Sequence, residues 1–304
     1  MPFPAIWMNG RITDPRDARV SVFDHGLLYG DGIFEGIRFY AKRAFRMREH
    51  MDRLVRSARC LELALPYSAD ALTRAAESVV EATGEADGYL RLLVTRGEGD
   101  LGLDPRSCKR PTVVIAAAAL RFFEGAETSG VKVVVASTRQ APPDVVDARI
   151  KSLNYLNRLL ARLEAVRAGA DEAIMLNREG RIAEGTSDNV FLVRDGVLFT
   201  PPAADGALEG VTRAVVLELA ASLGIPTNVE SLAAYDLRAC EEAFLVGTGA
   251  GLVPVRSVDG LAVPACPGPI FRRVNAAFEK RVRDEGRADE GRDARSSDGA
   301  ARPG

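Results

Sequence analysis

Hydrophobic and polar residues alternate with a period of two in some segments of the chain and with a period near 3.6 in others. Residues 5–12 follow the first pattern around Asn9-Gly10, a pair that favours a tight hairpin turn. The alternation predicts further strands at residues 32–40, 89–95, 111–118, 131–137, 172–176, 181–193, 242–246 and 253–255.

The helical period predicts helices at residues 50–63, 69–82, 154–168, 212–223 and 269–282. The helix at 154–168 carries an apolar stripe and is closed by Gly169. This stripe consists of Leu156, Leu159, Leu160 and Leu163.

Strand-rich halves with clustered helices indicate an α+β fold of two domains and not one doubly wound sheet. We expect a small N-terminal α/β domain at residues 1–119, a connector at 120–130 and a larger C-terminal domain at 131–283. Residues 284–304 contain no large apolar side chain, so a disordered tail is predicted there. Active sites tend to lie between two such domains.

Composition narrows the possible functions. The 304 residues have a formal net charge of −2 and 47% hydrophobic residues, which gives no reason to expect nucleic acid or a membrane as a partner. No signal peptide is recognised, and the four cysteines are scattered, so a reduced, cytoplasmic protein is expected. With His25 and His50 as the only histidines, a histidine-based metal site is excluded.

Lys151 is one of only five lysines, and its position is unusual. It closes a β-like stretch at 145–150 and directly precedes the periodic helix at 154–168. A lysine that is half buried at such an edge has a lowered pKa and can attack an aldehyde. An ordinary surface lysine remains the alternative from the local sequence alone.

Glu184 lies in an apolar strand, between Ile182 and Val190. A carboxylate in that setting needs a cationic or hydrogen-bonding partner, and a protonated ring nitrogen would serve. The alternative is a glutamate at a β-bulge on a strand edge.

Three segments have features of an anion site. Leu208, Gly210, Val211 and Thr212 belong to the start of a predicted helix, where free N–H groups and the helix dipole favour a phosphate. The glycine-rich loop at 247–251 follows a strand and offers further donors, and Arg53 could add a bidentate charge. The alternatives are an ordinary N-cap threonine, a glycine turn and a solvated arginine.

Residues 97–102 match the pattern G-x-G-x-x-G, but Pro105 follows shortly afterwards and stops a helix there. A dinucleotide fingerprint requires that helix, so we reject it. A lysine amine, a buried acid and two phosphate loops together describe a pyridoxal phosphate site.

The chain resembles the class IV, or fold-type IV, pyridoxal-phosphate aminotransferases. The resemblance runs from about residue 7 to 282 and rests on YGDGIFEGIRFY, EHMDRL, KSLNYLN, EGTSDNVF, LEGVTR and GTGAGLVPVRSVDG. It implies that Lys151 forms the Schiff base, that Glu184 faces the ring nitrogen and that Tyr155 lies near the phenolic oxygen. It further implies a homodimer or larger assembly and a phosphate site made of Arg53, Val211, Thr212 and Thr248.

Within this family the chain is most similar to branched-chain amino acid aminotransferases, which implies transfer from Leu, Ile or Val to 2-oxoglutarate. The likeness places the substrate beside Tyr29, Phe34, Gly36, Tyr89 and Arg91, with part of the wall from a neighbouring subunit. It also implies that the substrate carboxylate meets the loop of Thr248, Gly249 and Ala250. Arg91 would receive the second carboxylate of 2-oxoglutarate.

Rival functions stay open at this point. A D-amino acid aminotransferase shares KSLN and EHMDRL, but its trap of an arginine and histidines has no counterpart after Thr95-Arg96-Gly97. An aminodeoxychorismate lyase shares the cofactor site. Gly251 stands where branched-chain enzymes often have glutamate, which leaves the substrate range open. A non-catalytic carrier of the cofactor and a nicotinamide oxidoreductase are the alternatives from other classes.

Overall fold

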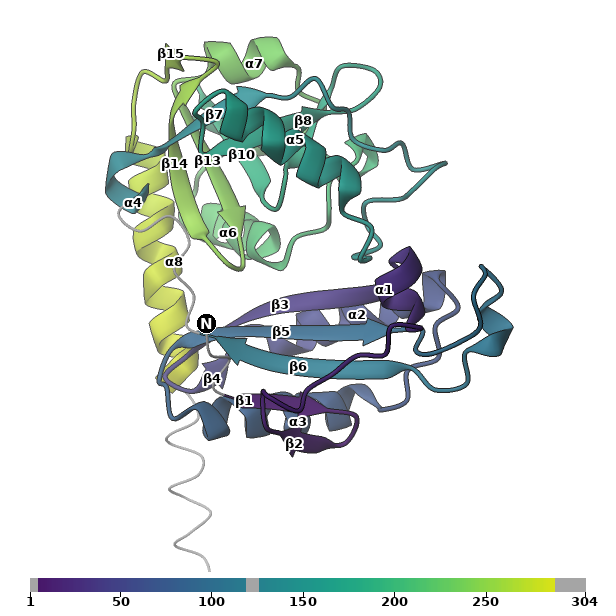
Figure 1. The fold of residues 1–304 in the computed structure, drawn as a ribbon. Coiled ribbons are helices and arrows are strands. Elements are labelled where there is room, and N and C mark those ends of the chain that lie inside the picture. Colours follow the sequence, from purple (N-terminus) through teal and green to yellow (C-terminus); the bar gives the residue numbers. More distant parts are fainter. Residues whose placement is uncertain (1–4, 119–125, 288–304) are drawn as a thin grey trace, which may run out of the picture.

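The computed structural model describes residues 5–118 and 126–287. They form two lobes, each built around its own sheet, and the long helix α8 (Pro269–Arg287) runs along one side of both (Figure 1). The predicted α+β architecture is confirmed. The exact domain limits at 119 and 131 stay a prediction.

The first lobe contains a six-stranded antiparallel sheet in the order β2-β1-β6-β5-β3-β4. The predicted hairpin at its edge is confirmed, with Asn9 and Gly10 both at positive φ (48° and 106°) as a tight turn requires. Its strands are β1 (Ala5–Met8), β2 (Arg11–Thr13), β3 (Gly32–Tyr40), β4 (Arg43–Ala44), β5 (Gly88–Thr95) and β6 (Thr112–Ala118).

Two amphipathic helices cover one face of this sheet, namely α2 (Met47–Cys60) and α3 (Ala69–Thr83). Leu54 of α2 and Leu72 of α3 are fully buried in the same core cluster as Ile37 of β3. The short helix α1 (His25–Tyr29) precedes β3, and a 3-10 turn (Pro105–Ser107) lies between β5 and β6.

The second lobe contains a larger mixed sheet in the order β12-β11-β10-β13-β14-β7-β8-β9, with β15 paired to β14. The parallel pairs are β11–β12, β7–β14 and β7–β8. Its strands are β7 (Val131–Val135), β8 (Glu172–Leu176), β9 (Ile182–Gly185), β10 (Asn189–Arg194), β11 (Val197–Thr200), β12 (Thr227–Val229), β13 (Glu242–Gly247), β14 (Gly251–Val258) and β15 (Leu261–Ala262).

Helices cover this sheet on different sides. Helix α6 (Val211–Ser222) and α8 pack where Phe191 and Phe244 stack with ring centroids 5.3 Å apart. Helix α5 (Leu156–Arg167) packs on β8, while α4 (Ala126–Ser129) and α7 (Ala234–Ala239) are short. The ring of Phe278 in α8 also packs edge-on against that of Phe45 in the first lobe, with ring centroids 5.9 Å apart. This helix therefore joins the two lobes.

The prediction of a β-like stretch at 145–150 is wrong. Val145 and Val146 both donate their N–H groups to the carbonyl of Pro142, and Ile150 donates to that of Asp147. These local bonds form turns, so the segment before Lys151 is irregular.

The single strand predicted at 181–193 is also wrong, because the chain forms two strands, β9 and β10. Gly185 donates to the carbonyl of Asp188 (2.7 Å), which reverses the chain between them and lets β9 pair with β8 while β10 pairs with β13. Glu184 therefore lies next to the end of a strand.

The structure corrects the predicted bounds of the connector between the domains and of the C-terminal tail. Part of the predicted connector forms α4, and residues 119–125 lie outside the described part of the chain. The tail was predicted to begin at residue 284, but α8 continues to Arg287; the prediction for 288–304 lies outside the described residues. Among the described residues, no helix combines the length and apolarity needed to cross a bilayer.

Candidate active site

A cavity of about 410 Å³ lies between the two lobes, a size typical of small-molecule sites. Strands β3 and β5 of the first lobe and the ends of β9, β10 and β13 of the second contribute to its walls. The structure brings together fifteen of the sixteen residues that the sequence singles out: Phe34, Gly36, Arg53, Tyr89, Arg91, Lys151, Tyr155, Glu184, Leu208, Gly210, Val211, Thr212, Thr248, Gly249 and Ala250.

Lys151 is held in the cavity by the first lobe, although it belongs to the second half of the chain. The N–H of Phe34 donates to the carbonyl of Lys151 (3.0 Å), and the N–H of Lys151 donates to Ser57 Oγ (3.2 Å). The next residue, Ser152, forms a bridge with Ile33 of β3. These backbone contacts fix the lysine across the gap between the lobes.

The amine of Lys151 has an altered proton affinity. Burial and the nearby Arg53 guanidinium lower its pKa to about 7, and Arg158 adds to the effect. Glu35 and Glu184 act in the opposite direction without cancelling it. A substantial fraction of this amine is therefore neutral, and nucleophilic, near neutral pH.

Glu184 is buried and accepts hydrogen bonds on both carboxylate oxygens. Arg158 donates to Oε1 at 2.5 Å and Gln140 does so at 3.4 Å. Asn189 and the backbone N–H of Leu208 donate to Oε2 at 3.1 and 3.0 Å. The requirement for a partner in this apolar setting is thus met within the chain, and three of the four donors, Arg158, Gln140 and Asn189, are residues that the sequence did not single out.

The start of α6 forms one wall of the cavity. Its N-cap is Gly210, which has no side chain to cap the first N–H groups of the helix, those of Val211 and Thr212. A Cβ at Gly210 would collide with the Asn189 side chain. The glycine therefore permits the close approach of Asn189. Val211 and Thr212 line the cavity, so an anion there would meet the N-terminus of the helix, where the dipole favours it.

Arg53 stands opposite this helix and is oriented by two residues that the sequence analysis missed. Its guanidinium donates to both oxygens of Glu35 (2.8 and 2.7 Å) and to the carbonyl of Glu209 (2.9 Å). His50 Nδ1 lies 2.8 Å from the same carboxylate. Burial opposes ionisation of Glu35, but Arg53 and His50 outweigh it and lower its pKa to about 2.

Aromatic side chains line the opposite end of the cavity. The guanidinium of Arg91 lies 4.5 Å from the centroid of the Phe34 ring and 5.5 Å from that of Tyr89. Gly36 lies near Tyr89 on the paired strands, and a Cβ at this position would collide with the Tyr89 hydroxyl. This end combines apolar surface, one cation and one phenol.

The turn between β13 and β14 forms the third wall. Arg38 of β3 donates to the carbonyl of Gly249 (3.1 Å) and so ties this turn to the first lobe. Asp188 also lines the cavity, and burial together with Glu172 raises its pKa to about 7.

Tyr29 is the sequence-predicted residue that does not line this cavity. It lies at the end of α1, where its ring packs edge-on against His25 and its hydroxyl accepts a hydrogen bond from Gly102 (2.8 Å). From this position Tyr29 does not contribute to the cavity of its own chain.

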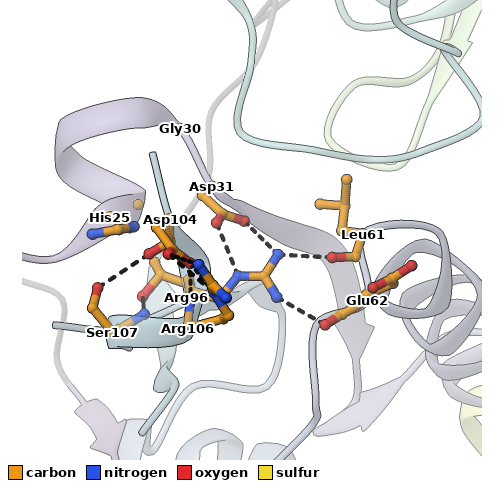
Figure 2. Close-up of polar contacts among 12 residues, drawn as sticks. His25, Gly30, Asp31, Leu61, Glu62, Arg96, Asp104, Arg106 and Ser107 are labelled. Carbon is orange, nitrogen blue, oxygen red and sulfur yellow. Dashed lines mark hydrogen bonds and ion pairs between the residues drawn. The ribbon is translucent and has the colours of Figure 1, made fainter. Parts of the chain in front are cut away.

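Arg96, in the Thr95-Arg96-Gly97 segment, has a structural setting (Figure 2). It donates to both oxygens of Asp31 (2.9 and 3.0 Å) and to the carbonyls of Leu61 and Glu62 (2.7 and 2.8 Å). Its hydrogen-bonding capacity is thus used to join β5 to the end of α2 and not to line the cavity.

A cavity between two α+β lobes thus brings together a lysine with a lowered pKa, a buried carboxylate and the N-terminus of a helix, which are the groups that amino-group chemistry requires. The family model of "Amino-transferase class IV" matches residues 32–258. The chain belongs to the class IV aminotransferases.

Similar proteins and solved structures support this family assignment. The chain is 45% identical to a "Putative branched-chain-amino-acid aminotransferase" of Methanocaldococcus jannaschii, covering 85% of this chain and 89% of that protein. It is 39% identical to the branched-chain-amino-acid aminotransferase of Escherichia coli K12, over 90% and 91%. The crystal structure of a branched-chain aminotransferase from Thermoproteus uzoniensis with norvaline has a TM-score of 0.86 at 39% identity, over 91% and 94%. That of the branched-chain amino acid aminotransferase from Thermobaculum terrenum in its PLP-form has a TM-score of 0.83 at 30% identity, over 92% and 94%.

Proposed function

We propose that this aminotransferase uses pyridoxal 5'-phosphate and moves the amino group of Leu, Ile or Val to 2-oxoglutarate. The observation that carries the proposal is that one cavity contains the buried Lys151, Glu184 and a helix N-terminus without a side-chain cap. Burial lowers the pKa of this lysine and so supports the proposal. The bound cofactor would supply an aldehyde and an electron-withdrawing pyridine ring.

The residues present fit this cofactor. The N–H groups of Val211 and Thr212, the guanidinium of Arg53 and the loop at Thr248 would hold its phosphate. Glu184 would face the ring nitrogen, and Tyr155 would lie beside the phenolic oxygen. The ring of Tyr155 is already positioned by an edge-on contact with Phe34 at 5.3 Å.

Lys151 would act twice. Its neutral amine would bind the aldehyde, and, once displaced by the amine of the substrate, it would take the proton from the substrate Cα and return it on the cofactor side. Glu184 would stabilise positive charge at the ring nitrogen during this transfer. The pKa of about 7 suits an amine that both accepts and gives a proton.

The substrate end suits an apolar side chain and, alternatively, a second carboxylate. Phe34 and Tyr89 would contact the branched side chain, while Arg91 would pair with the distal carboxylate of 2-oxoglutarate. The N–H groups of Thr248 and Gly249, with Ala250 next to them, would receive the α-carboxylate. The names of the relatives support this choice of substrate.

We also propose that the chain works as a homodimer. Four leucines on α5 are between 46% and 70% exposed: Leu156, Leu159, Leu160 and Leu163. Phe23 and Leu27, before and within α1, are exposed as well. Apolar surface of this extent is typical of a protein interface. Tyr29 would then complete the cavity of the partner subunit. The cytoplasmic location stays a prediction.

A D-amino acid aminotransferase is the nearest rival. Arg96, whose donors go to Asp31 and to backbone carbonyls, does not favour a carboxylate trap in this segment. An aminodeoxychorismate lyase would share the cofactor site and differ in its reaction.

An amino-donor panel with 2-oxoglutarate tests the substrate. We expect turnover with L-Leu, L-Ile and L-Val, and much less with D-Ala, D-Glu and (R)-1-phenylethylamine. Preference for D-Ala would overturn the substrate assignment and leave the cofactor site intact. Lys151→Ala should remove the visible absorbance of the bound cofactor, whereas Lys132→Ala, an exposed lysine on β7, should keep it.

A further inference from the structure

Arg158 lies in the first turn of α5, is only 9% exposed, and has no part in the function proposed so far. Its guanidinium donates to Glu184 Oε1 (2.5 Å) and to the carbonyl of Thr186 (3.2 Å). The two contacts clamp the carboxylate and the chain reversal that follows β9. A buried ion pair of this kind is costly unless its geometry is fixed, which makes the arrangement informative.

Among the donors to Glu184, Arg158 is the charged one. Gln140, Asn189 and the N–H of Leu208 are neutral and orient the carboxylate without balancing its charge. Arg158 therefore supplies both direction and charge compensation to this group.

The same guanidinium lies over the ring of Tyr155, 5.1 Å from its centroid. Arg158 thus contacts the two side chains that would face neighbouring positions of the cofactor ring. Its charge also acts on Lys151: burial and Arg53 lower the pKa of the amine, Arg158 adds a smaller effect in the same direction, and Glu35 and Glu184 act against it.

We propose that Arg158 is a positioning residue that holds Glu184 and Tyr155 in place for the cofactor ring. The proposal rests on the proposed use of pyridoxal phosphate. It adds a residue that would touch neither substrate nor cofactor but act through two side chains that would.

Helix α5 offers a matched control. Arg162 lies one turn after Arg158 and also pairs with a buried carboxylate, that of Glu172 (3.1 Å). Glu172 does not line the cavity. Arg162→Gln therefore removes an arginine and a partly buried ion pair from the same helix, at residues that do not line the cavity.

The test uses the full chain with two readouts: the Kd for pyridoxal phosphate, from an absorbance titration, and the pH midpoint of Lys151 labelling by an amine-reactive reagent in the cofactor-free protein. Arg158→Gln should raise the Kd by about 10-fold or more, because it leaves the carboxylate without its charged donor. It should also raise the labelling midpoint by about 0.5 pH unit or more.

Arg158→Lys keeps the charge but not the two-pronged geometry. Its Lys151 labelling midpoint should stay near that of the wild type, while its Kd for pyridoxal phosphate should rise. If Arg158→Gln does not fold, this variant provides the test of the proposal. Arg162→Gln should leave both readouts unchanged. The proposal is overturned if Arg158→Gln behaves like the wild type, or if Arg162→Gln changes both readouts as much. A wild type that binds no pyridoxal phosphate would instead remove the proposed function.

Discussion

The Nζ atom of Lys151 lies 4.7 Å from the centroid of the Phe34 ring, and the backbones of the same two residues are hydrogen-bonded. The lysine of the second half of the chain is thus positioned by a strand of the first lobe. A change at this strand therefore affects the reactive amine and the substrate end together.

The reactivity of Lys151 should depend on pH with a midpoint near 7 in the cofactor-free protein. Because its pKa is about 7, the amine is mostly neutral above that value, whereas an ordinary lysine is not neutral until about pH 10. Reductive labelling followed by peptide mass spectrometry measures the midpoint, and exposed Lys132 in the same sample is the control. Equal midpoints for the two lysines would contradict the lowered pKa.

The same pKa makes the stability of the cofactor-free protein depend on pH. The folded lysine has a lower pKa than the unfolded one, so between about pH 7 and 10.5 the unfolded state binds more protons. This group alone therefore makes folding less favourable as the pH falls through that range. Urea unfolding of wild type and Lys151→Met should show a difference that shrinks toward high pH, and a constant difference would contradict the prediction.

Glu35→Gln should destabilise the protein by about 3–5 kcal/mol, because it leaves the buried Arg53 without its charge partner. Cofactor affinity should fall as well, since Arg53 then loses its orientation. Urea unfolding and a cofactor titration measure the two effects. Glu49→Gln removes a half-exposed pair with Arg46 on the same helix and should cost about 1 kcal/mol or less.

The carboxylate of Glu35 also predicts acid sensitivity. Its folded pKa of about 2 lies below the ordinary value of 4.5, so its contribution to stability is complete above about pH 4.5 and is lost as the pH falls toward 2. In Glu35→Gln this part of the acid dependence should be missing. An unchanged acid profile would mean that other groups dominate the transition.

Gly36→Ala should impair substrate binding more than cofactor binding. The new methyl group would collide with the Tyr89 hydroxyl and push this ring into the substrate end of the cavity. We expect the KM for the branched-chain donor to rise about 10-fold or more. The absorbance of the bound cofactor is the internal control, and its loss together with activity would indicate a general collapse of the site.

Leu159→Glu should disrupt the proposed homodimer. Leu159 is 59% exposed on α5, and a charge there would be buried without a partner if this helix lies in an interface. Light scattering after size-exclusion chromatography measures the mass. Leu261→Glu, at a residue 60% exposed on β15, is the matched control and should leave the assembly unchanged. A wild-type protein that is already monomeric would refute this part of the proposal.

The local signals in the sequence determined much of this protein. The Asn9-Gly10 pair specified its hairpin, the periodic segments specified most helices and strands, and the spacing of Lys151 and Glu184 within their motifs pointed to the site. These features depend on backbone preference and side-chain period, which act over a few residues.

Only the tertiary structure decided what each face touches. The leucines of α5 have a perfect helical period, but Ala161 and Ala165 face the sheet, because small residues let this helix approach β8 closely. The contacts of Arg53 with Glu35, and of Arg158 with Glu184, join residues 18 and 26 positions apart. A period describes where side chains point along an element and not what packs against them, so exposed stripes and buried ion pairs follow only from the fold.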